Sequence, residues 1–374
     1  MKNFLKLMFL PVLLFVAGCS SNSDDTPGGG NTDDFDRGAM LKNWSDNIII
    51  PSFENFSVEV QTLEEVSLKF TQDPTEANLA DLRSAYKEAY IQFQTVSPFD
   101  IGKAETLNYR NNLNTYPVDA AAMEEKIQAG EFNLELPSAM DEQGFPALAY
   151  LLYGLGDTDA EIIAHYTSNA NAATYKNYLN AVSVRVNSLT SEVLSDWKNN
   201  FRDQFVNNTS SSSTGSVDRL TNDYIMYYEK FLRAGKIGIP AGVFSGNPVP
   251  ENVEAYYSAE LSKQLYLKSV ETVHNFFVGN YFGEDRKGLS YVDYLRYLNT
   301  IKNGDPLGGL INGQFNNIRM QADELDANLV SQIESDNTKM LAAYDELQKN
   351  VVLLKVDMVQ ALSVSIDYVD SDGD

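Results

Sequence analysis

Histidine and carboxylate side chains are the groups of this chain that could bind a metal or move a proton, and few of them lie at productive spacings. The sequence has only two histidines. His165 follows Glu161 by four residues, which places both side chains on one helical face, but two ligands leave a metal site incomplete. We therefore expect a solvated ion pair there, and core packing for His274, which lies among apolar residues.

Two other polar pairs could line a cleft. Asn114 and Asp119 flank an aromatic-proline turn, and Glu254 and Ser258 are four residues apart, which would place a carboxylate and a hydroxyl on one helical face. Structural roles are the alternative for both pairs. Asp119 could cap a helix that begins at Ala120 while Asn114 satisfies a loop, and Glu254 and Ser258 could form capping or interhelical hydrogen bonds.

The acidic end of the chain resembles part of a calcium loop. Asp370, Asp372 and Asp374 surround Gly373, but the twelve-residue pattern with its terminal glutamate is absent. A disordered tail or a weak calcium or iron site is the expectation, and no resident cofactor is predicted. The sequence also has no Gly-rich phosphate loop, no G-x-S-x-G and no H-E-x-x-H.

The only cysteine, Cys19, lies where a bacterial lipoprotein carries its lipid. A basic start and the apolar stretch from Phe4 to Ala17 precede Val16-Ala17-Gly18-Cys19, which is a lipobox. Residues 1–18 are therefore predicted to be a lipoprotein signal peptide, because the apolar run is shorter than the roughly 20 residues needed to span a bilayer. A lipidated Cys19 would anchor the protein to a membrane. A single cysteine also excludes disulfides and thiol catalysis.

The segment after Cys19 and the net charge indicate where the protein works. Residues 19–34 contain no large apolar side chain and are predicted to be a flexible tether. Ser23-Asp24-Asp25 resembles the short acidic signal that sends Bacteroidetes lipoproteins to the cell surface. We expect an outer-membrane lipoprotein that faces the periplasm or the cell surface. The net charge of −24 makes nucleic acid an unfavourable partner and favours cations or basic partners. We expect a monomer.

Helical periodicity dominates the first half of the mature chain. Asp73-Pro74-Thr75-Glu76 predicts a helix start, with Asp73 as the cap. The apolar residues that follow recur every three or four positions and predict one buried face: Leu79, Leu82, Tyr86, Ala89, Tyr90 and Phe93. Further helices are predicted over Met123–Ile127, stopped by Gly130, over Leu148–Leu152, stopped by Gly154, and as a pair from Ala160 to Trp197.

Residues 207–216 form a Ser/Thr-rich break, which we interpret as a linker between an N-terminal helical half, residues 35–206, and a C-terminal half, residues 217–374. The second half has the same character, with one exception at its end. Helices are predicted from Val217 to Gly235, from Pro250 to Phe277 and from Asp323 to Ala361, and a strand at Val364, Ile366 and Tyr368. The predicted fold is all-α, built as a helical bundle.

Five segments spread across the chain carry recognisable motifs. They are residues 84–90 (SAYKEAY), 113–119 (LNTYPVD), 144–154 (GFPALAYLLYG), 253–258 (VEAYYS) and 354–374, which ends in DGD. In this order they resemble the imelysin family, bacterial envelope proteins first described as peptidases and often linked to iron acquisition. The resemblance implies two helical-bundle halves around a shared cleft.

The chain departs from that family at the residues that could do chemistry. The family signature is G-x-H-x-x-E, whose histidine and glutamate share a helical face, and here those positions hold Pro146 and Ala149. Neither side chain can ligate a metal or move a proton. Ser97-Pro98-Phe99-Asp100 stands where many relatives have a glutamate and an arginine. The resemblance leaves these cleft residues: Asn114, Tyr116, Pro117, Asp119, Gly144, Pro146, Glu254 and Ser258.

The sequence therefore favours a non-catalytic lipoprotein that binds a ligand or a partner in an iron-uptake context. Two alternatives remain open at this point. One is a metallopeptidase-like enzyme with an altered active site, and the other is a structural partner of an outer-membrane receptor or transport protein. Pro146 is expected in the first turn of a helix or at a kink, since proline cannot donate a backbone hydrogen bond.

Overall fold

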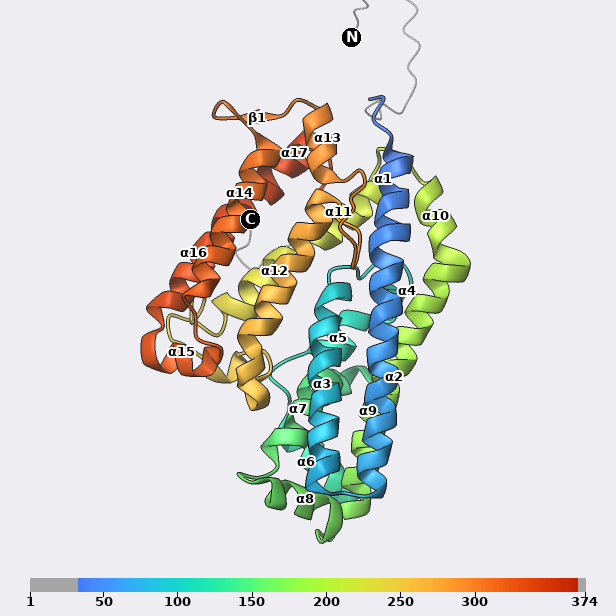
Figure 1. The fold of residues 1–374 in the computed structure, drawn as a ribbon, viewed down its shortest axis with the longest axis vertical. Helices are drawn as coiled ribbons and strands as arrows, with labels where there is room; N and C mark the ends of the chain where they lie inside the picture. The colour runs from blue at the N-terminus through green and yellow to red at the C-terminus, as the bar shows by residue number, and fades with distance from the viewer. Residues whose placement is uncertain (1–32, 369–374) are drawn as a thin grey trace, which may run out of the picture.

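The computed structural model describes residues 33–368 and confirms an all-α fold of two packed helical-bundle halves (Figure 1). The predicted signal peptide, Cys19, most of the predicted tether and the acidic end at residues 370–374 lie outside the described residues. Within residues 33–368 no helix is both long and apolar enough to cross a membrane.

Three long helices form the framework of the first half. The chain enters through α1 (Arg37–Asn43), continues through a π-helical turn (Trp44–Ile49) into α2 (Ile50–Gln72), and returns as α3 (Glu76–Val96). α9 (Ala172–Asp196) packs on the other side of α2. The short helices between them are α4 (Lys103–Thr106), α5 (Tyr109–Asn114), α6 (Ala120–Ala129), α7 (Gly144–Ala149) and α8 (Asp159–Thr167).

The second half begins after α10 (Arg202–Asn207) and the loop that follows it. α11 (Ser216–Met226) continues as a π-helical stretch through Gly238. The remaining helices are α12 (Ser262–Val278), α13 (Tyr291–Tyr297), α14 (Leu307–Asp323), α15 (Leu329–Asp336), α16 (Thr338–Val351) and α17 (Val359–Leu362). A short hairpin, with two residues in each strand, pairs β1 (Ile301–Lys302) antiparallel with β2 (Asp305–Pro306).

The hydrophobic stripe predicted for α3 is confirmed, because all six of its residues are fully buried. The predicted cap is wrong in detail. Thr75 is the N-cap, since its side chain accepts a hydrogen bond from the Asn78 backbone amide, whereas Asp73 ends α2. The predicted stop at Gly130 is confirmed, because this glycine ends α6 with a positive φ of 76°.

Two predicted helices of the second half are shorter or more broken than expected. The helix predicted from Pro250 begins only at Ser262, because the chain turns at Ala255, whose φ is 62°. The helix predicted over Asp323–Ala361 is interrupted around Asp326 and again at Asn337.

The predicted strand at Val364, Ile366 and Tyr368 is also wrong. This segment is not paired with a strand, and it is held instead by Asn222 of α11. Asn222 donates to the Ser365 carbonyl at 2.9 Å and accepts from the Asp367 amide at 3.1 Å. The amide side chain of Asn222 thus pairs with backbone hydrogen-bonding groups of this extended segment, which a neighbouring strand would otherwise do.

The two halves meet along α3 and α12, which pack against each other. A buried ion pair close to this contact also joins them. Arg110 of α5 donates to the Asp223 carboxylate of α11 at 2.8 Å and to the Ser97 carbonyl at 2.6 Å. Its guanidinium lies 4.6 Å from the centre of the Phe231 ring. Burial raises the pKa of Asp223 to about 6, against the opposing effect of Arg110.

Candidate functional site

A buried pair of opposite charges occupies the contact between the halves. Lys236, near the end of the π-helical stretch, is 4% exposed and donates to the carboxylate of Glu254, which is 2% exposed. The same ammonium group donates to the side-chain carbonyl of Gln94 on α3 at 3.0 Å. Two charges removed from water in this way need further hydrogen bonds to be tolerated.

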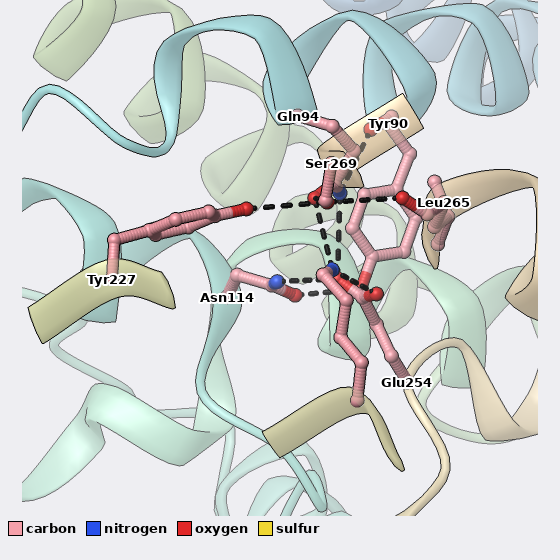
Figure 2. Close-up of polar contacts among 8 residues, drawn as sticks. Tyr90, Gln94, Asn114, Tyr227, Glu254, Leu265 and Ser269 are labelled. Atoms are coloured by element: carbon pink, nitrogen blue, oxygen red, sulfur yellow. Dashed lines mark hydrogen bonds and ion pairs between the residues drawn. The ribbon is translucent and has the colours of Figure 1, made fainter. Parts of the chain in front are cut away.

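Side chains from both halves supply those hydrogen bonds, and Figure 2 shows them pointing toward one another. Asn114, at the end of α5, donates to Glu254 at 2.7 Å, and Gln94 donates to the same oxygen at 3.3 Å. Tyr90 donates to the side-chain carbonyl of Asn114 at 2.6 Å. Ser269 of α12 donates to Gln94 at 2.9 Å. We call Lys236, Glu254, Gln94, Asn114 and Ser269 the buried polar network.

In this arrangement Glu254 has a structural role. One of its oxygens accepts from Asn114 and Gln94, and the other accepts from Lys236. A carboxylate with both oxygens already paired to an ammonium and two amides is poorly placed to act as a base or to ligate a cation. The negative charge also raises the pKa of Tyr90 and of Tyr116, for which burial is the larger cause, so both phenols stay protonated.

A small cavity lies next to the buried polar network. Its volume is about 140 Å³, and its walls come from both halves of the molecule. The first half contributes Tyr116, Pro117, Val118, Pro146 and Ala149, and the second half contributes Glu251, Val253, Ala255, Tyr256 and Tyr257. The two positions where the resemblance places a histidine and a glutamate thus both face this cavity, and neither offers a polar side-chain group there.

The local sequence explains how α7 brings these positions to the cavity. Gly144 begins the helix with a φ of 71°, and a Cβ there would lie 2.2 Å from the Leu113 carbonyl oxygen, so only glycine fits. The next residue, Phe145, stacks on Tyr90 at 4.5 Å between ring centres. Pro146 lies in the first turn, as expected, where its missing amide removes no helical hydrogen bond.

The turn at Ala255 separates Glu254 from the cavity. Ala255 has a left-handed backbone, which is costly for a residue with a Cβ. Glu254 points into the buried polar network, while Val253 and Ala255 on either side of it line the cavity. The ion pair with Lys236 therefore holds the segment that carries Tyr256 and Tyr257.

A second, larger cavity of about 410 Å³ shares Tyr256 and Tyr257 with the first. Ser258 lies on this side, where its hydroxyl is 3.1 Å from that of Tyr86. Ser258 has a non-helical backbone, so the predicted single helical face carrying both Glu254 and Ser258 does not form.

Apart from Ser258, the structure places the other seven predicted cleft residues in different surroundings. Tyr116, Pro117 and Pro146 line the small cavity, and Asn114 and Glu254 meet directly behind it. Asp119 caps α6 by accepting from the Ala122 amide at 2.9 Å, which is the structural alternative weighed above. Gly144 lies behind the cavity, against Leu113.

Sequence reasoning missed Lys236, Gln94 and Arg110. All three are polar side chains that are at most 4% exposed. Gln94 follows directly after Phe93 of the buried α3 stripe, which was the available signal for a polar residue inside the contact. The contacts Arg110–Asp223, Lys236–Gln94 and Gln94–Glu254 each join residues more than 100 positions apart in sequence. Spacing alone could not show these contacts.

Neither histidine takes part in this site. Glu161 does not pair with His165 as predicted, because its carboxylate accepts from the Asp157 and Thr158 amides at the start of α8. Within residues 33–368 no group of three or more His, Cys, Asp or Glu side chains could hold a metal ion.

His274 is buried, as predicted. Its Nδ1 accepts from Arg319 at 2.6 Å, so Nε2 carries the proton and donates to Asn312 at 2.6 Å. Burial lowers the pKa of His274 to about 4.

Two solved structures share this fold. An imelysin-like protein from Psychrobacter arcticum superposes with a TM-score of 0.68 at 14% sequence identity, covering 89% of this chain and 97% of that chain. A protein described as an iron-regulated protein A precursor from Parabacteroides distasonis gives a TM-score of 0.69 at 17% identity, covering 86% and 95%. At these identities the likeness concerns the fold alone.

Sequence comparison gives two further matches. Iron-regulated protein A of Synechococcus elongatus is 24% identical over 102 residues, which is 27% of this chain and 29% of that protein. The match therefore spans less than a third of that relative. The model of the imelysin family, Peptidase_M75, matches residues 49–354, which is most of the chain. Together with the fold and the ordered motifs around the cavity, this match shows that the chain belongs to the imelysin family.

Proposed function

We propose that this protein is a membrane-anchored binding protein without catalytic activity, whose ligand occupies the cavity between the two helical halves. The observation that carries the proposal is the composition of that cavity. Pro146 and Ala149 face it in place of a histidine and a glutamate, and the nearest buried carboxylate, Glu254, is fully paired. Aromatic surface remains for binding, and Glu251 is the one carboxylate among the described residues that line the cavity, with no histidine, cysteine, serine or second carboxylate beside it there.

An iron-uptake context supports the choice of ligands to test. Two of the similar proteins carry the name iron-regulated protein A. Titration calorimetry of the lipidated protein in detergent with iron(III) citrate, haem, calcium and an unstructured peptide is the first experiment. We expect heat from at least one of these probes, and its loss in Tyr256→Ala.

The matched control for that experiment is Tyr297→Ala. Tyr297 is 48% exposed, close to the 44% of Tyr256, but it lies on α13, far from α7 (Figure 1). The control should bind as the natural protein does. If none of the four probes gives a heat of binding, or if both variants lose that heat equally, the binding proposal is wrong.

The anchoring proposal rests on the lipobox that ends at Cys19. Metabolic labelling with a palmitate analogue should mark the natural protein and leave Cys19→Ser unlabelled, and fractionation should find the labelled form with the outer membrane. Equal labelling of both forms would contradict lipidation at this residue. Co-purification of the anchored protein after crosslinking in cells would reveal a receptor or transport protein as its partner.

A further inference from the structure

Tyr256 and Tyr257 form an aromatic corner between the two cavities. Their ring centres are 5.2 Å apart with the planes 80° to each other, and Tyr150 stands against Tyr257 at 5.2 Å and 61°. Tyr256 is 44% exposed, which leaves part of its side chain accessible to a ligand. We use the name aromatic corner for Tyr150, Tyr256 and Tyr257.

Backbone geometry holds this corner in place. A Cβ at Gly154 would lie 2.6 Å from the ring of Tyr150 and 2.7 Å from that of Tyr257, so the absence of a side chain allows the rings to approach. The left-handed turn at Ala255 sets the direction of the two residues that follow it. Rings that are fixed before a ligand arrives lose little freedom when it binds.

The charges around the corner are mostly negative. Glu251 lines the small cavity and Glu260 lines the larger one, and neither carboxylate contacts a lysine or arginine among the described residues. Glu260 accepts only from the Asn328 amide, at 3.2 Å. Lys87 is the one cationic side chain that lines the larger cavity, in a chain of net charge −24. A positive ligand would meet favourable ring faces and uncompensated carboxylates.

The molecule already uses the same geometry at Tyr153, a lining residue of the larger cavity whose ring packs against an arginine that does not itself line the cavity. The guanidinium of Arg83 lies over the Tyr153 ring, 4.5 Å from its centre. Arg83 also donates to the Leu152 carbonyl at 2.9 Å and to Asp159 at 2.8 Å. A tyrosine face together with nearby oxygen acceptors is therefore an established environment for a guanidinium in this protein.

We propose that the aromatic corner binds the basic side chain of a peptide, with its guanidinium or ammonium group against Tyr256 and between Glu251 and Glu260. The two adjoining cavities, about 140 and 410 Å³, give room for the residues on either side of the basic one. This inference rests on the proposed function and narrows it, since it names the chemical class of the ligand.

The test uses the tripeptide acetyl-Gly-Arg-Gly-amide and its citrulline analogue, which has the same shape without the charge. Binding to protein labelled with 3-fluorotyrosine is followed by fluorine NMR of the Tyr256 signal, which is assigned from Tyr256→Phe. The affinity of every variant, including those that lack this signal, is measured by titration calorimetry. We expect the arginine peptide to bind about tenfold more tightly than the citrulline peptide. Free arginine amide should bind more weakly than the tripeptide if the flanking residues contribute.

Variants of the corner separate its two contributions. Tyr256→Phe keeps the ring face and should bind within about twofold of the natural protein, whereas Tyr256→Leu should weaken binding about fivefold. Glu260→Gln should also weaken it, and Lys87→Gln should strengthen it, because a like charge is removed. Tyr297→Leu, on the exposed tyrosine of α13, should leave binding unchanged.

Three outcomes would overturn this inference: equal binding of the two peptides, equal effects of Tyr256→Leu and Tyr297→Leu, or weaker binding in Lys87→Gln. If the arginine and citrulline peptides bind equally and both shift the Tyr256 signal, the cavity is still a ligand site, but its ligand need not be cationic. If neither peptide nor any of the four probes named above shifts that signal, the proposed function itself fails.

Discussion

This chain differs from the G-x-H-x-x-E signature of the imelysin family at two residues that could do chemistry. Proline and alanine at positions 146 and 149 take the place of the histidine and glutamate of the signature at the cavity wall, and neither side chain can ligate a metal or act as a base. The glycine that opens the same signature is kept, and its reason is visible in the backbone. Gly144 combines a positive φ with a close approach to the Leu113 carbonyl. In this motif, the glycine that the fold needs is therefore kept, although the histidine and glutamate that chemistry would need are absent.

A substitution at Gly144 should test that scaffold requirement. We expect Gly144→Ala to lower the free energy of unfolding by at least about 2 kcal/mol, because the backbone strain adds to a 2.2 Å contact. Gly130→Ala is the matched control, since Gly130 has a similar φ of 76° and nothing within 4 Å of a Cβ. Its cost should be only about 1 kcal/mol in urea denaturation. Equal costs would contradict the contact as the cause.

His274 should make the protein less stable in mild acid. Its pKa is lowered from 6.5 to about 4 by burial, so the unfolded chain takes up a proton before the folded protein does. Stability from the neutral ring is complete above pH 6.5 and is lost as the pH falls toward 4, by at most about 3 kcal/mol.

The measurement is the free energy of unfolding at pH 7 and at pH 4.5 for the natural protein and for His274→Gln. Asp218 and Asp223, whose pKa values are raised to about 6 by burial, act in the opposite direction, but they do so in both proteins. The variant should therefore lose less stability on acidification than the natural protein. An identical loss in both would show that His274 does not titrate in this way.

At the scale of elements, the ion pair in the buried polar network and its Gln94 partner connect three parts of the chain. Lys236 comes from the π-helical stretch, Gln94 from α3 and Glu254 from the turn before α12. Removal of one charge should leave the other buried and unpaired, which costs more than replacement of both.

A double-mutant cycle on that ion pair should show this coupling. We expect Lys236→Met and Glu254→Leu each to cost roughly 3–5 kcal/mol in unfolding free energy, and the double variant to cost clearly less than their sum. Additive costs would mean that the two charges do not stabilise each other. The adjacent cavity should also lose its ligand in Lys236→Met, since Tyr256 and Tyr257 follow the segment that Glu254 holds.

Elements with regular periodicity could be predicted from the sequence, and those set by one unusual residue could not. The α3 stripe and the glycine stop of α6 follow from local pattern. The helix predicted from Pro250 starts late because Ala255 adopts a left-handed conformation, which alanine rarely shows and which no local signal announced. The partners of Lys236 and Arg110 are set by packing between distant helices. The cavity could be anticipated through Pro146 and Tyr116, and Glu254 was also predicted near it, but Lys236, the partner of Glu254, was not.

For the whole molecule, the two halves make one site that neither contains alone. The small cavity takes walls from both, and the ion pairs Lys236–Glu254 and Arg110–Asp223 lie close to the same contact. The chain leaves the described region at Asp33, beside α13, at the end of the molecule opposite α7 (Figure 1).

We propose that this cavity binds a ligand without cleaving it. Saturation-transfer NMR of an unstructured decapeptide with a single arginine reports both binding and cleavage in one sample. We expect the signals of the arginine side chain to gain intensity in the difference spectrum with the natural protein and to lose it with Tyr256→Leu. We also expect the peptide to stay intact at equal concentrations of protein and peptide. New peptide signals that a chelator suppresses, or an unchanged difference spectrum in Tyr256→Leu, would contradict this proposal.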